Sequence, residues 1–142
     1  MEIQIYNQTQ TIPESEETIL KLTRWICQEL KLSVKTLNII FTNDDALLTL
    51  HNDYLNQDTF TDVMTFNLGD QSAIDAEIYI STDRVKENAV HYKVSIFNEI
   101  ARLIIHACLH LYGYDDKMAA EQKLMKEKEE YYLGIVEKEF IT

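Results

Sequence analysis

One segment limits the folds that this chain can adopt. Residues 97–112 read FNEIARLIIHACLHLY, and as an α-helix they would carry apolar side chains on nearly every face. A helix without a polar face cannot lie against water, so other elements have to cover it. We therefore predict that this segment is the central buried helix of the molecule.

The rest of the chain supplies strands and helices to cover it. Strand-like segments, β-branched or alternating in polarity, occur at residues 2–6, 36–42, 61–66 and 76–81. Helical spacing predicts a short helix that begins around Asn43 and four further helices at about 14–31 (with Pro13 suited to its first turn), 82–90, 96–111 and 117–137. This order predicts an α+β (α/β-like) fold, in which one four-stranded mixed sheet packs against about five helices.

Length and composition agree with that fold. The chain has 142 residues, 46% of them hydrophobic, which suits a single domain over residues 1–142 with its own core. Its 3 glycines and 1 proline argue against a turn-rich β-sandwich. Cys27 and Cys108 lie within apolar helical patterns, so we expect buried thiols in a reducing compartment.

Charge and hydropathy limit the partners. The N-terminal residues lack the features of a signal peptide, and no apolar run reaches the roughly 18 residues of a membrane span, so we expect a cytoplasmic protein without a membrane partner. The net charge of −11 opposes long-range attraction to nucleic acid. A nucleic-acid substrate would therefore need a local basic groove or a metal ion.

The end of the central helix carries a set of metal-binding residue types, HACLHLYGYDD at residues 106–116. His106 and His110 are four residues apart, so in a helix they share one face about 6 Å apart along the axis. Gly113 would end the helix with a left-handed residue and let Asp116 return to the same face. The pattern favours three zinc ligands and an open fourth position over a pair of core histidines. Asp116 could instead cap the last helix, and Asp115 could exchange roles with it.

The same spacing occurs in the metzincin proteases, where a glutamate after the first histidine is the general base. This chain has Ala107 at that position. The spacing therefore favours metal binding, and Ala107 argues for a reaction other than proteolysis.

The segment HACLHLYGYDD resembles the HGxLHLxGYDH signature of the YbeY family, bacterial single-strand-specific metallo-endoribonucleases of ribosomal RNA maturation and ribosome quality control. Further stretches are similar to the family in order and spacing: TFTDVMTF to its PTDVLSF strand, AEIYIS to its GDI-containing strand, NEIARLIIH to the segment before the metal helix, and EQKLMKEKEEYYL to its terminal helix. The resemblance covers most of the chain.

The resemblance implies an endoribonuclease that uses zinc or another divalent transition metal, held by His106, His110 and Asp116. It implies single-stranded RNA, at the end of small-subunit ribosomal RNA, as substrate, and the ribosome or ribosomal proteins as partners, with no role for DNA. RNA would lie between the TDVMTF strand and the metal helix. The general base is left open between Asp115 and a second metal-bound water.

Three positions depart from the family pattern. Asp116 replaces the third histidine, Ala107 replaces a glycine, and Leu55 replaces an arginine suited to binding phosphate. Aspartate is an acceptable zinc ligand, so the metal site survives. The phosphate-binding role would pass to another basic residue, for which the candidates are Arg84, Lys86, Lys93 and Arg102.

Four other polar residues could have a structural or a functional role. Glu99 fits a functional role or a salt bridge with Arg102 equally well, and Asp62 is favoured as the start of a strand. His51 and His91 have no partner at ligand spacing, so we expect structural roles.

Two alternative functions stay open: a zinc peptidase of metzincin-like geometry, and a ribosome-associated binding protein with a weakly active metal site.

Overall fold

A computed structural model describes residues 1–55 and 61–140, without the side chains of residues 54 and 55. The elements in order are β1 (Glu2–Asn7), α1 (Glu16–Glu29), β2 (Val34–Thr42), α2 (Asp44–Leu55), β3 (Val63–Asn67), β4 (Ile74–Ser81), α3 (Thr82–Tyr92), α4 (Ile96–Tyr112) and α5 (Ala119–Phe140). This part of the chain therefore holds one four-stranded mixed sheet and five helices, which confirms the predicted α+β fold.

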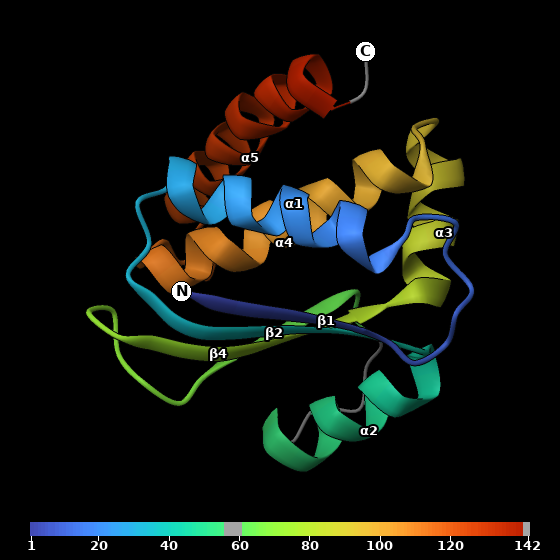
Figure 1. The fold of residues 1–142 in the computed structure, drawn as a ribbon, viewed down its shortest axis with the longest axis horizontal. Helices are drawn as coiled ribbons and strands as arrows, with labels where there is room; N and C mark the ends of the chain where they lie inside the picture. Colours follow the sequence, from blue (N-terminus) through green and yellow to red (C-terminus); the bar gives the residue numbers. More distant parts are fainter. Residues whose placement is uncertain (56–60, 141–142) are drawn as a thin grey trace.

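The strands lie side by side in the order β1-β2-β4-β3. β1, β2 and β4 are parallel, and β3 is the antiparallel edge strand beside β4. Ile39 pairs with Ile5 on one side and Ile78 on the other, so branched apolar residues form a row across the sheet. Figure 1 shows α1, α3, α4 and α5 over one face of the sheet and α2 against the other. Helices on both faces explain why β2 and β4 are mostly apolar and buried.

The helix α4 is the centre of the molecule, as predicted. It packs against α1, α3 and α5 and against strands β3 and β4. Its side chains Ile100, Leu103 and Ile104 are at most 1% exposed and belong to the main core. Three polar residues of α4 recur every four positions and are only partly buried, which places them in one stripe along the helix: Arg102, His106 and His110. The other two, Asn98 and Glu99, are buried near its start.

Two predicted helix starts are wrong by a few residues. Pro13 precedes α1 instead of occupying its first turn, because Ser15 is the N-cap and its Oγ accepts a hydrogen bond from the backbone N–H of Thr18 at 3.1 Å. The last helix begins at Ala119, after a turn that follows Gly113. Asn43 caps α2 as predicted, through a 2.8 Å hydrogen bond from the backbone N–H of Ala46 to its Oδ1.

Cys27 and Cys108 are both buried free thiols, as predicted. Among the described residues, no single helix is long and apolar enough to span a membrane, and the one helix pair that meets these criteria, α3 with α4, is bent by 113°.

Candidate metal centre

The chain reverses direction at Gly113, the residue that ends α4. Its φ is +127°, a conformation that side-chain-bearing residues rarely adopt, and a Cβ there would lie 2.9 Å from Nε2 of Gln71. The backbone N–H of Tyr114 closes the turn by donating to the carbonyl of Leu109 at 3.0 Å. Glycine at this position thus lets the following residues fold back over the end of the helix.

The turn brings Asp116 to the two histidines of α4. Asp116 Oδ2 lies 3.5 Å from Nε2 of His106 and 3.4 Å from Nε2 of His110. One ligand atom from each of these residues lies within 4.8 Å of the other two. Two imidazole nitrogens and a carboxylate oxygen form a donor set that suits zinc and similar transition metals. The three side chains fit around one divalent ion.

The carboxylate of Asp115 contacts the backbone of the turn. Its Oδ1 accepts a 2.7 Å hydrogen bond from the backbone N–H of Asp116, so it braces the turn that carries its neighbour. The last helix begins at Ala119, so neither aspartate is the residue directly before it, and Glu121 accepts the hydrogen bond from the backbone N–H of Met118 there. Of the two acids, Asp116 is the one whose carboxylate faces both histidines.

The three side chains stand in the wall of a cleft of about 990 Å³. One wall is the edge strand β3, and the other is the end of α4 with the turn that follows. The family resemblance predicted an RNA-binding cleft between these two elements. Among the described residues lining it, the only lysine or arginine is Lys117.

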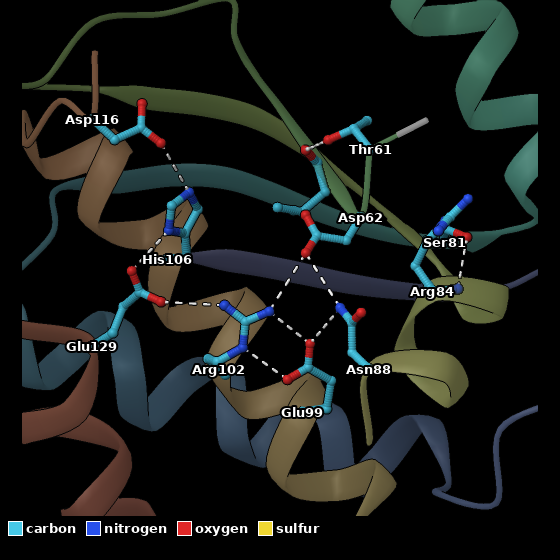
Figure 2. A network of polar contacts seen from close by, with 11 residues as sticks. Thr61, Asp62, Ser81, Arg84, Asn88, Glu99, Arg102, His106, Asp116 and Glu129 are labelled. Atoms are coloured by element: carbon cyan, nitrogen blue, oxygen red, sulfur yellow. Dashed lines mark hydrogen bonds and ion pairs between the residues drawn. The ribbon is translucent and has the colours of Figure 1, made fainter. Parts of the chain in front are cut away.

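A polar network adjoins His106 on the side away from Asp116 (Figure 2). His106 Nδ1 is 3.0 Å from Oε2 of Glu129, on α5. The guanidinium of Arg102 contacts the other oxygen of Glu129 at 3.4 Å and holds Glu99 through two hydrogen bonds of 2.7 and 2.8 Å. Arg102 also contacts Asp62 at 3.4 Å. Chiefly because of the hydrogen bonds with Glu99, the pKa of Arg102 is raised above its ordinary value.

The ionisation of His106 reflects this setting. Burial lowers its pKa, but the hydrogen bond and the charge of Glu129, together with the charges of Asp116 and Asp62, outweigh burial. The net result is a pKa raised above the ordinary value of 6.5. Without a metal ion, the acidic surroundings therefore favour the protonated ring.

The comparison with protein families decides what kind of protein carries this site. The family model described as Endoribonuclease YbeY matches residues 3–137. The chain belongs to the YbeY family. Curated YbeY endoribonucleases are similar along much or all of the chain: that of Chlorobium phaeobacteroides is 36% identical over 142 residues, 100% of this chain and 96% of the relative. That of Flavobacterium psychrophilum is 47% identical over 101 residues, 70% of this chain and 71% of the relative.

The fold agrees with this assignment. A solution structure of a protein from Thermotoga maritima matches with a TM-score of 0.68 and 28% sequence identity, covering 97% of this chain and 91% of that chain. Membership makes this chain an endoribonuclease, a hydrolase that acts on RNA.

The departures from the YbeY pattern can now be placed. Ala107 is completely buried in α4, so the position after His106 offers no general base to the cleft. Leu55 ends α2, but its side chain lies outside the described residues. Arg102, one candidate to replace the missing arginine, already pairs with Glu99, Asp62 and Glu129 and is thereby compensated.

Of the other three candidates, Arg84 and Lys86 lie on α3, and Lys93 directly follows that helix. Arg84 pairs with Asp44 and Glu87, while Lys86 and Lys93 are exposed. None of the three is among the residues that line the main cleft. Lys117 is the basic residue that sequence reasoning missed, although it directly follows Asp116.

The structure also gives the positions of the other polar residues considered in the sequence. Glu99 forms the salt bridge with Arg102, the second of its two interpretations, and Asp62 both precedes β3 and lines the cleft. His51 is buried at the cleft, whereas His91 is exposed on α3. Glu129 had no sequence signal, because it lies 23 residues from His106 in a helix of otherwise ordinary charge pattern.

Proposed function

We propose that this YbeY-family chain is a metal-dependent, single-strand-specific endoribonuclease that acts at the 3′ end of small-subunit ribosomal RNA, in the cytoplasm. Ribosome maturation and quality control are the processes that this activity would serve. The observation that carries the proposal is the set of three donor atoms, within 4.8 Å of one another, on the wall of a cleft of about 990 Å³. Membership of a family of endoribonucleases supports RNA as the substrate.

His106, His110 and Asp116 would hold the ion. A divalent ion bound there, zinc or a similar transition metal, would polarise a phosphoryl oxygen and lower the pKa of a water molecule. The three side chains are 21%, 29% and 41% exposed, so each is partly open to the cleft.

Other residues of the cleft would position the RNA. Lys117 supplies one positive charge for a phosphate, and β3 runs along the opposite wall with the side chains of Thr65 and Asn67. Asp115 lines the same cleft and is a candidate to accept the proton from the attacking hydroxyl or water.

The net charge of the chain affects how it would approach RNA. A net charge of −11 repels naked RNA at long range but complements basic proteins. We therefore include ribosomal proteins among the partners, as contacts that bring the chain to ribosomal RNA.

The direct test is cleavage of a single-stranded RNA carrying the 3′-terminal sequence of small-subunit ribosomal RNA. Wild type, His110→Ala and the matched control His91→Ala are compared, with and without a chelator. Loss of several kcal/mol of charge stabilisation corresponds to a fall of about a thousandfold or more in His110→Ala and in chelated wild type. His91 is exposed on α3, so His91→Ala keeps wild-type activity.

Two outcomes would overturn the proposal. Equal cleavage by wild type and His110→Ala would assign any nuclease activity to something other than this site. Tight ribosome binding by a chain that cleaves no RNA, with or without added metal, would make it a binding protein instead.

A further inference from the structure

His106 lies between two carboxylates, one on each side of its ring (Figure 2). Its Nε2 faces Asp116, and its Nδ1 is 3.0 Å from Oε2 of Glu129. An ionised carboxylate can only accept a hydrogen bond, so the contact with Glu129 requires the hydrogen on Nδ1. In the neutral ring this leaves the lone pair on Nε2, the nitrogen that faces the candidate metal position.

Glu129 is an unusual residue in its helix. The buried residues of α5 are Met125, Glu129 and Val136, so one of three is charged. Burying a carboxylate is costly, and an apolar residue of similar size often packs as stably. A buried glutamate at this position therefore suggests a role beyond packing α5 against α4.

The orientation of Glu129 is fixed from behind. Arg102 contacts Oε1 of Glu129 at 3.4 Å, while Oε2 is left for His106. Arg102 is itself anchored by Glu99, whose side chain is 1% exposed and accepts two hydrogen bonds from it. The chain Glu99, Arg102, Glu129, His106 thus runs from the core to the cleft without a gap.

We propose that Glu129 is the positioning residue of the metal centre: it holds the hydrogen on Nδ1 of His106 and so presents the Nε2 lone pair to the ion. This inference rests on the proposed function, because it assigns His106 as a ligand. It makes the C-terminal helix α5 part of the site, although α5 contributes no ligand. Such partners of a ligand histidine typically change metal affinity by roughly 10- to 100-fold.

The test uses the full chain and Zn²⁺ as the probe. Glu129→Leu removes the acceptor at similar size, and Glu129→Gln keeps an acceptor oxygen without the charge. Glu127→Gln is the matched control, because Glu127 is exposed on the same helix. Zn²⁺ affinity is measured by competition with a chromophoric chelator, and the tautomer of His106 is read by nitrogen NMR in the metal-free protein, above the pH at which the ring loses its charge.

The expected order of Zn²⁺ affinity is wild type, then Glu129→Gln, then Glu129→Leu, with Glu129→Leu weaker by roughly 10- to 100-fold and Glu127→Gln unchanged. The metal-free wild type shows the Nδ1–H tautomer of His106, and Glu129→Leu loses that preference. If Glu129→Leu does not fold, Glu129→Gln gives the same test with a smaller shift.

Zn²⁺ affinity and a tautomer unchanged in both Glu129 variants would overturn the inference and leave Glu129 a purely structural residue. A wild type that binds no Zn²⁺ would instead overturn the proposed function. The tautomer measurement still decides the hydrogen bond in that case, so the two failures are distinguishable.

Discussion

Each ring nitrogen of His106 faces a different carboxylate: Nε2 faces Asp116, and Nδ1 faces Glu129. His110 and Asp116 were found because helix geometry and a glycine turn relate them to His106 over a few residues. Glu129 lies 23 residues from His106, in a helix with many acidic residues. Nothing in the local sequence distinguishes Glu129 from its neighbours, so only the packing of α5 against α4 reveals its contact with His106.

The metal-free protein should show the titration of His106 in its stability. The folded-state pKa of His106 is raised, so the protonated ring contributes stability that is complete below the unfolded-state pKa of about 6.5 and is lost as pH rises through the folded-state value. Urea unfolding of chelator-treated wild type and Glu129→Gln checks this. The free-energy advantage of wild type should be larger near about pH 5.5 than near about pH 8.5. An advantage that grows with pH would contradict the assignment.

Among the elements, α4 was predicted best, because the apolar composition of the segment itself indicates a buried helix. The first residue of a helix is harder to predict, because it can depend on a single hydrogen bond. In α1 the cap is Ser15, whereas Pro13 had suggested an earlier start. The position of β4 between β2 and β3 was not predicted, because strand pairing joins residues far apart in sequence. That pairing is what puts β3 at the sheet edge, beside the metal helix.

The turn after α4 gives a prediction at this scale. Gly113→Ala forces a side chain into a backbone conformation with φ of +127° and should cost about 1–3 kcal/mol of unfolding free energy. It should also weaken Zn²⁺ binding, because the turn carries Asp116. The matched control is Gly134→Ala in α5, where a Cβ would meet nothing within 4 Å. That change should stabilise the helix by about 0.5–1 kcal/mol. Chemical denaturation measures the unfolding free energy of both variants. Equal changes in Gly113→Ala and Gly134→Ala would contradict the role of the turn.

For the molecule as a whole, the strong negative charge and an RNA substrate have to be reconciled. The sequence showed the conflict but assigned the compensating cation to other residues, because only the fold reveals which basic side chain lines the cleft. Arg102 lies in the interior network, and Lys117 lies beside the candidate ligands.

Lys117→Ala should therefore weaken binding of single-stranded RNA. It should also reduce the slope of log affinity against log salt by about 0.7, the value for one phosphate contact on a single strand. Lys86→Ala, an exposed lysine on α3, should leave the slope unchanged. Fluorescence anisotropy over a salt series measures both. Equal slopes for wild type and Lys117→Ala would remove Lys117 from the RNA contact.

The central claim is that His106, His110 and Asp116 together hold one metal ion. The most direct measurement is the metal-to-protein ratio of chains purified without chelator, by elemental analysis of wild type, His110→Ala and His91→Ala. We predict about one divalent transition-metal ion per chain in wild type and His91→Ala, and a small fraction of that in His110→Ala. No bound transition metal in wild type, or an equal ratio in His110→Ala, would contradict the account.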